Sequence, residues 1–95
     1  MPLTRDKILG HDNERMAFKF TMLNDGKVVP CQISYAALDE LAGMKGTETS
    51  ARPAQFLSLR NRIEEIASDL FAQAPPVDRY VVRIFVKHIT RPPSP

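Results

Sequence analysis

The sequence predicts an α+β domain in which one long helix covers one face of a small antiparallel or mixed sheet. Two segments of alternating apolar residues flank an Asp-Gly turn, an amphipathic segment of helical period follows, and another alternating segment lies near the C-terminus. The expected order is strand, strand, short helix, long helix, strand. The 95 residues suit one domain, which we place at residues 16–90.

The first two strands are expected to form a hairpin around Asp25-Gly26, because these residue types favour the positive φ angles of a tight turn. The apolar residues of the first strand are Met16, Phe18, Phe20 and Met22. Those on one face of the second are Val29, Cys31 and Ile33. Pro30 cannot donate a ladder hydrogen bond, which predicts that the second strand lies at a sheet edge or a bulge and that the first is interior.

Two helices are expected after the hairpin. Ser34 is suited to cap the first, which should end at Gly43, and residues 44–52 are interpreted as a mobile loop. Pro53 suits the first position of the long helix. Its buried stripe is predicted to contain Phe56, Leu59, Ile63, Ile66, Ala67 and Leu70.

The last strand is predicted over residues 80–87, and the two termini are expected to lie outside the main domain. Residues 1–15 are interpreted as a flexible lead or a short edge strand. Residues 91–95 are proline-rich and are expected to form a disordered tail.

Composition favours a cytoplasmic protein without a membrane segment. The net charge of +2 is too small to indicate a nucleic-acid partner by itself. A single cysteine excludes an internal disulfide and fits a reducing compartment. No run approaches the ~20 apolar residues of a membrane span, and the N-terminus lacks the apolar core of a signal peptide.

Several segments together resemble a family of small proteins of unknown function found mainly in proteobacteria. The matching segments are Val29-Pro30-Cys31-Gln32-Ile33-Ser34 with Ala37-Leu38, Phe56 with Arg60-Asn61-Arg62-Ile63-Glu64-Glu65-Ile66-Ala67, and Val82-Arg83-Ile84. The likeness runs from about Phe18 to Ile84. It implies a small stand-alone α+β domain and no catalytic residues, and the proline-rich tail is not part of the family pattern.

The sequence offers no constellation for covalent, metal or cofactor chemistry. Cys31 is the one thiol, and it shares a strand face with Val29 and Ile33, so core packing is the favoured interpretation. His11 and His88 are separated from it and from each other, without the spacing of zinc ligands. We therefore predict no catalytic residue, no metal site, no cofactor and no enzyme activity.

Two surfaces are predicted as candidates for binding. The first is the margin of the long helix, where apolar and charged side chains adjoin: Leu57, Arg60, Glu64 and Phe71. A homodimer contact is one interpretation; cover by the first helix or by residues 44–52 is the alternative.

The second surface is the outward side of the last strand, where basic residues alternate with apolar ones: Arg79, Arg83, Phe85, Lys87 and Arg91. Cations can neutralise phosphates and an exposed Phe85 can stack on a base. The alternative is a strand whose long cationic stems shield its solvent face.

The sequence thus favours an interaction module without enzyme activity that self-associates. The second hypothesis is a nucleic-acid-binding accessory or regulatory protein that uses the basic last strand.

Overall fold

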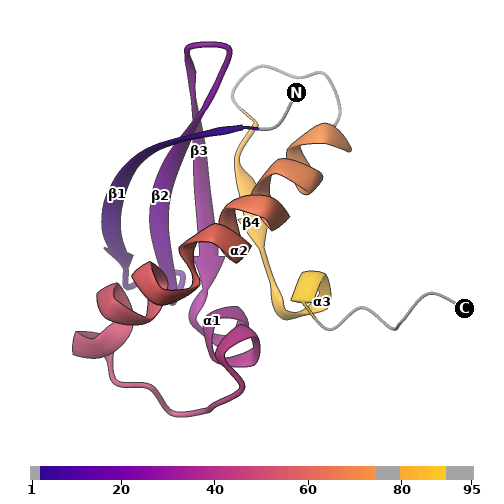
Figure 1. The fold of residues 1–95 in the computed structure, drawn as a ribbon. Coiled ribbons are helices and arrows are strands. Elements are labelled where there is room, and N and C mark those ends of the chain that lie inside the picture. Colours follow the sequence, from indigo (N-terminus) through magenta and orange to yellow (C-terminus); the bar gives the residue numbers. More distant parts are fainter. Residues whose placement is uncertain (1–2, 75–79, 90–95) are drawn as a thin grey trace, which may run out of the picture.

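The computed structural model describes residues 3–74 and 80–89, which form a sheet with helices on one of its faces (Figure 1). The elements are β1 (Thr4–Asp12), β2 (Ala17–Asn24), β3 (Lys27–Ser34), α1 (Tyr35–Ala42), η1 (Thr49–Ala51), α2 (Arg52–Ala72), β4 (Val82–Ile84) and α3 (Val86–Ile89). The α+β class is confirmed. The predicted order lacks one strand before the helices and one short helix after the last strand.

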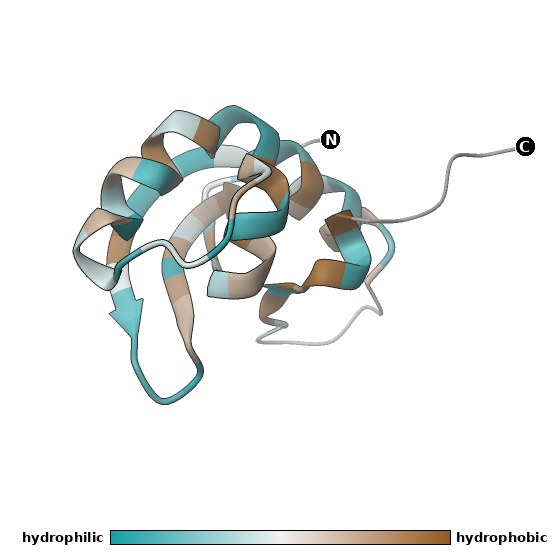
Figure 2. Ribbon diagram, turned by 90° about the horizontal axis from the view of Figure 1, so that it is seen from below, coloured by the Kyte–Doolittle hydropathy of each residue, from teal (hydrophilic) through white to brown (hydrophobic). Residues whose placement is uncertain are grey.

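The sheet is mixed and has the order β1-β2-β3-β4. Neighbouring strands are antiparallel from β1 to β3, whereas β3 and β4 are parallel. Helix α2 runs obliquely across one face of the sheet (Figure 1). Hydrophobic and hydrophilic residues both occur along α2 (Figure 2), as a helix with one buried side requires.

The core lies between the sheet and α2. Phe56 of α2 packs its ring 4.9 Å from that of Phe18 and 5.1 Å from that of Phe20. The side chains predicted for the core face of the hairpin are buried, except that of Met16. On α2, Phe56, Ile63, Ile66 and Ala67 are buried, and Leu59 and Leu70 pack partly buried against them. The predicted stripe is therefore confirmed.

Met16 is an exception to the predicted first strand. Its φ is 51°, its side chain is 62% exposed, and β2 begins only at Ala17. The carbonyl of Met16 accepts a hydrogen bond of 2.8 Å from the amide of Tyr35. Met16 thus belongs to the turn that leads from β1 into β2.

The hairpin between β2 and β3 is confirmed, with Asp25 at φ 55° and Gly26 at φ 84° as expected for a type I′ turn. The prediction that Pro30 keeps β3 at an edge is wrong, because β3 lies between β2 and β4 without a bulge. Hydrogen-bonded pairs alternate from the turn outward, so Pro30 opposite Thr21 directs its nitrogen away from β2. Strand β4 begins opposite Cys31, so this missing donor costs no ladder bond.

Strand β1 is nine residues long and forms one edge of the sheet. Its pairing with β2 shifts register between Arg5 and Ile8 and again between Ile8 and Gly10. Such irregularities discourage another chain from adding to a free edge. The division of the chain at residue 16 stays a prediction, and residues 91–95 lie outside the described residues.

The predicted helix caps are confirmed. The hydroxyl of Ser34 accepts from the amide of Ala37 at 3.1 Å, and Gly43 ends α1 at φ 73°. The predicted loop at residues 44–52 is shorter, since η1 follows Glu48 and α2 begins at Arg52, one residue before Pro53.

The last strand is much shorter than predicted. Val82 and Ile84 are fully buried beside β3, but β3 ends at Ser34, which caps α1, so no strand remains for later residues to pair with. The chain instead turns into α3, and the Phe85 amide donates to Nδ1 of His88 at 2.8 Å. Burial and then the charge of Lys87 lower the pKa of His88, which favours the unprotonated nitrogen that accepts this bond.

Candidate functional site

A cluster of polar side chains joins the two helices at the start of α2. It consists of Asp39 from α1, Thr47 from the connecting loop, and Arg52 and Gln55 from α2. The guanidinium of Arg52 donates to Oδ1 of Asp39 at 2.6 Å and to Oε1 of Gln55 at 2.8 Å. The amide of Gln55 donates to Oδ1 of Asp39 at 3.0 Å and to the Thr47 hydroxyl at 3.2 Å. We call these four residues the Asp39–Arg52 cluster.

The charges of this cluster are held inside the protein. The side chains of Arg52 and Asp39 are only 7% and 14% exposed. Burial disfavours the charged form of Asp39, but hydrogen bonds from Arg52, Gln55 and Thr47 and the charge of Arg52 outweigh it and lower its pKa to about 2. Asp39 is therefore ionised and neutralised at physiological pH, so it has no free charge to offer a ligand.

Tyr35 extends the cluster toward β1. The guanidinium carbon of Arg52 lies 4.6 Å above the centre of the Tyr35 ring, a cation–π geometry. The Tyr35 hydroxyl lies 2.7 Å from Nδ1 of His11, which is at the solvent-exposed end of the chain of contacts. Nε of Arg52 is buried and has no hydrogen-bond partner within the described part of the chain.

Sequence reasoning missed the Asp39–Arg52 cluster. Asp39 lies on a short helix and Arg52 lies in what was predicted to be a loop, thirteen positions further along the chain. No local pattern of residue types marks such a pair, because only the packing of α1 against α2 brings the two together.

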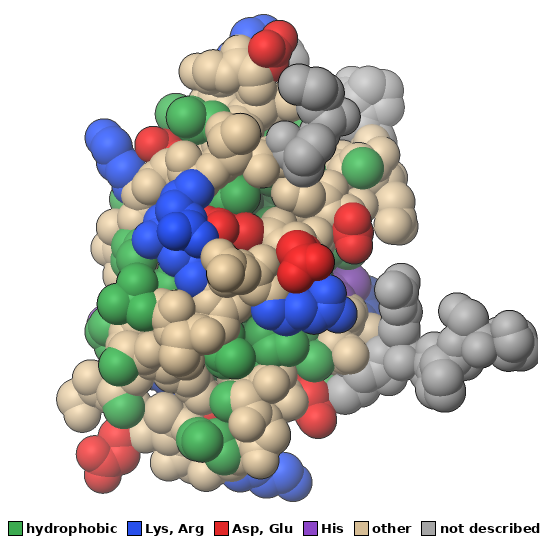
Figure 3. Space-filling view, in the orientation of Figure 1, with side chains coloured by type: hydrophobic (Ala, Val, Ile, Leu, Met, Phe, Trp, Pro, Cys, Tyr) green, Lys and Arg blue, Asp and Glu red, His purple; other side chains and the backbone are tan. Residues whose placement is uncertain are grey.

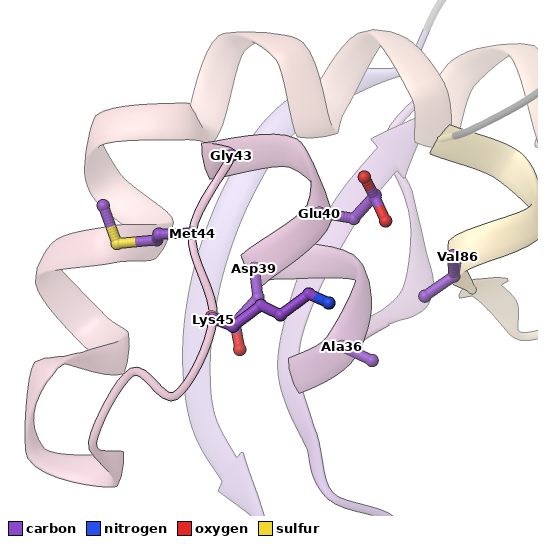
Figure 4. Close-up of a pocket in the computed structure, with 7 residues that line it drawn as sticks. All are labelled: Ala36, Asp39, Glu40, Gly43, Met44, Lys45 and Val86. Atoms are coloured by element: carbon purple, nitrogen blue, oxygen red, sulfur yellow. The ribbon is translucent and has the colours of Figure 1, made fainter.

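A hollow adjoins this cluster at the C-terminal end of α1 (Figure 4). Its volume is about 510 Å³, within the size range of small-molecule pockets. It is lined by α1, the loop after it and the start of α3, and the residues are Ala36, Asp39, Glu40, Gly43, Met44, Lys45 and Val86. We call it the α1 hollow.

The predicted surface on α2 is largely occupied by contacts within the chain. Glu64 accepts hydrogen bonds from Arg5 of β1 at 2.8–3.1 Å and from Arg60 at 3.1 Å. The side chains of Arg60 and Glu64 are only 17% and 13% exposed. Figure 3 shows Lys or Arg and Asp or Glu side chains lying side by side on the face that carries α2. The hydrogen bonds from Arg5 to Glu64 connect β1 to α2.

Leu57 and Phe71 do not join these charges in one exposed patch. Leu57 is 56% exposed, but Phe71 is partly buried, with its ring 6.5 Å from that of Tyr80. Fourteen residues of helix separate the two by roughly 21 Å along the axis.

The predicted basic surface is also divided. Arg83 lies in β4 and is exposed, Phe85 follows it at 43% exposure, and Lys87 lies in α3. Arg79 and Arg91 lie outside the described residues. The described members thus do not form the single alternating strand face that the sequence predicted.

The structure places Arg83 in register with a basic residue of β2, with one strand between them. On the face of the sheet opposite α2, Lys19 pairs with Gln32, and Gln32 pairs with Arg83. We call these three side chains the open-face row. Lys19 and Arg83 are exposed, and Gln32 is 7% exposed. Within the described residues, none of the three side chains has an ion pair or hydrogen bond.

Cys31 is a core residue, as predicted. It is 3% exposed, and burial raises the pKa of its thiol to about 12, so it is protonated at physiological pH. Within residues 3–74 and 80–89, no group of three or more His, Cys, Asp or Glu side chains could hold a metal ion. No helix in the same residues is long and apolar enough to cross a membrane.

Comparisons with known proteins agree on one family. The model of the family described as "Protein of unknown function (DUF1488)" matches residues 5–84. The chain belongs to this family. A crystal structure of a family member from Shewanella loihica PV-4, also a protein of unknown function, has a similar fold, with a TM-score of 0.70 and 25% sequence identity over 87% of this chain and 89% of that one. A search of curated proteins finds no match.

Proposed function

We propose that this protein is an interaction module without enzyme activity, and that it binds an acidic segment of a partner protein on the open face of its sheet. The observation that carries the proposal is the open-face row, in which two cations flank an amide and none of the three has a side-chain partner among residues 3–74 and 80–89. The helices pack on the other face, so this row has no cover from α1 or α2 (Figure 1).

The geometry of the row suits carboxylates. Adjacent strands lie about 4.8 Å apart, so the backbones at Lys19 and Arg83 are roughly 10 Å apart, and their long side chains can converge on groups above Gln32. The Gln32 amide is not among the buried polar atoms that lack a partner, so it reaches solvent and can offer one donor and one acceptor to a bound segment. Gln32 is therefore expected to exchange hydrogen bonds with water for hydrogen bonds with the partner.

The same face has an apolar end that fits a protein segment better than a nucleic acid. Leu23 pairs with Val28 next to the hairpin turn, and Val28 is 62% exposed. Single-stranded nucleic acid is usually held by aromatic side chains that stack on its bases. The outward side chains of β2 and β3 include no aromatic residue, and the Phe85 ring is stacked 6.0 Å from that of His88.

The absence of enzyme activity is part of the proposal and has separate support. The Cys31 thiol is buried and protonated, and the Asp39 carboxylate is ionised and fully engaged by Arg52 and Gln55. Neither is available as a nucleophile or a general base.

A fluorescent peptide of alternating glutamate and leucine tests the proposal by anisotropy in a salt series. We expect saturable binding that weakens with salt, and loss of about tenfold or more in Lys19→Glu and in Arg83→Glu. The control is Lys27→Glu, an exposed residue beside the turn that is outside the row. Equal binding by the control and by the two row variants would contradict the open face as the site, and tighter binding of oligo-dT than of the peptide would contradict the partner class.

Self-association is a second candidate, favoured by the exposed apolar residues at the hairpin end of this face. Strands β1 to β3, of eight or nine residues each, present roughly 400 Å² per copy, at the low end of interface sizes, where contacts are transient. We therefore expect a weak dimer that Val28→Asp abolishes. Analytical ultracentrifugation up to about 1 mM tests this, and a monomer throughout that range would exclude it.

A further inference from the structure

We propose that the α1 hollow binds a small zwitterion with an apolar body, in the chemical class of an apolar amino acid or short peptide. The ammonium of the ligand would lie at Glu40, its carboxylate at Lys45, and its apolar body over Ala36 and Val86. This site is separate from the open face of the sheet and does not depend on the function proposed above.

The walls of the hollow are fixed before any ligand arrives. Gly43 ends α1 in the left-handed conformation, and the amide of Met44 donates to the carbonyl of Asp39 at 3.0 Å. The far end of the loop is held by the bond from Gln55 to Thr47 at 3.2 Å. A loop anchored at both ends loses little further freedom on binding, which favours affinity.

The hollow has one cation and one anion without a charged partner in the described part of the chain. Asp39 is neutralised by its ion pair with Arg52 at 2.6 Å. Glu40 and Lys45 are exposed, and neither has an ion pair with the other or with any described residue. A ligand with both signs of charge can therefore satisfy both, whereas a simple anion or cation would satisfy one and face repulsion from the other.

The orientation of the ligand follows from the helix. Glu40 lies near the C-terminal end of α1, where the helix dipole is negative, and no basic side chain occupies the last turn. Both features attract the ammonium to this end. In Figure 4 the side chains of Glu40 and Lys45 extend toward the side where Val86 lies, and that of Met44 points the other way.

The apolar lining completes the choice of ligand. Ala36 and Val86 face the same space from opposite elements, α1 and α3 (Figure 4). Small-molecule pockets combine such apolar walls with a few polar groups that fix orientation. A hydrophilic zwitterion would leave these walls uncovered, so the ligand is expected to carry an aliphatic side chain.

Titration of the ¹⁵N-labelled protein with leucyl-leucine, followed by NMR, tests the proposal. We expect saturable shifts of amides in residues 36–45 and at Val86. N-acetyl-leucyl-leucine lacks the ammonium and leucyl-leucinamide lacks the free carboxylate, so each should bind about tenfold more weakly. Leucine and trileucine in parallel titrations distinguish a free amino acid from a longer peptide as the source of the end groups.

Variants that remove one charge each test the two contacts separately, and the same changes elsewhere on the surface serve as controls. Glu40→Gln should weaken leucyl-leucine about tenfold and remove the preference for the free ammonium. Lys45→Gln should remove the preference for the free carboxylate. Glu14→Gln and Lys27→Gln, exposed and outside the hollow, should change nothing. Absence of saturable shifts up to about 20 mM, or equal binding of all three dipeptides, would overturn the proposal.

Discussion

Replacing Arg52 with methionine keeps a long apolar side chain at the start of α2 but removes the guanidinium. Asp39, whose side chain is only 14% exposed, then has no counter-charge. The change also removes the donors to Gln55 and to the Tyr35 carbonyl. Removing one partner of a buried ion pair costs about 3–5 kcal/mol. Because Asp39 keeps its hydrogen bond from Gln55, we expect the lower end of this range, about 3 kcal/mol.

A loss of this size is a large part of the stability of the domain. At about 0.05–0.15 kcal/mol per residue, the whole chain has roughly 5–14 kcal/mol, and each kcal/mol shifts the Tm of such a domain by about 4–8 °C. Urea unfolding followed by circular dichroism should therefore show Arg52→Met destabilised by about 3 kcal/mol, with a Tm lower by roughly 12–24 °C. Adding Asp39→Asn should recover part of the loss, because the uncompensated charge is gone.

The control is Arg62→Met, which replaces an exposed arginine on the same helix and should change stability by less than about 0.5 kcal/mol. A loss below about 1 kcal/mol in Arg52→Met, or no recovery in the double variant, would refute the assignment of the Asp39–Arg52 cluster as a buried ionic contact.

Stability should also depend on pH through Asp39. Its pKa is about 2 in the folded protein against an ordinary value of 3.8, so the unfolded chain takes up this proton more readily. The contribution is present above about pH 4 and is lost as the pH falls through about 2, with a magnitude of at most about 2 kcal/mol. Unfolding curves of the wild type and Asp39→Asn across this range should converge toward low pH, and parallel curves would contradict the shift.

Three further predictions concern separate parts of the fold. Cys31, whose thiol pKa is about 12, should react with iodoacetamide only as the protein unfolds, and rapid native labelling would show that the thiol is accessible. Gly26→Ala should cost about 1 kcal/mol in thermal unfolding through its φ of 84° alone, because nothing lies within 4 Å of the added Cβ, and a cost above about 3 kcal/mol would reveal a clash. Glu64→Gln should cost about 1–2 kcal/mol at low salt and less at high salt, and an equal loss in both would argue against an ionic tie to Arg5 and Arg60.

The features that the sequence predicted well each depend on a few neighbouring residues. The Asp25-Gly26 turn, the Ser34 and Gly43 caps and the burial of Cys31 follow from backbone preferences and from alternation within one segment. Such signals need no knowledge of what the segment packs against.

The features that it did not predict depend on distant partners. Pro30 has no amide proton, so the sequence indicates only that no neighbouring strand accepts a hydrogen bond at this position. The strand could lie at an edge, or its neighbour could start one residue later. Residues far along the chain, in β4, decide between the two. The end of β4 is set by the point where β3 becomes α1, and the contact of Arg52 with Asp39 is set by how two helices meet. The open-face row was predicted in part. The sequence indicated that Arg83 is exposed, but only the register of the sheet aligns Lys19 with it.

The parallel pairing of β3 with β4 has a consequence for the order in which the chain can fold. The hairpin of β2 and β3 forms from adjacent residues, but one side of Cys31–Ile33 stays unpaired until both helices have been synthesised and Val82–Ile84 has arrived. A nascent or truncated chain that stops before Val82 therefore presents an apolar strand with a bare edge, which is the kind of surface that recruits other chains into aggregates. Val82–Ile84 thus complete the sheet, because they occupy the edge of β3 that would otherwise stay unpaired.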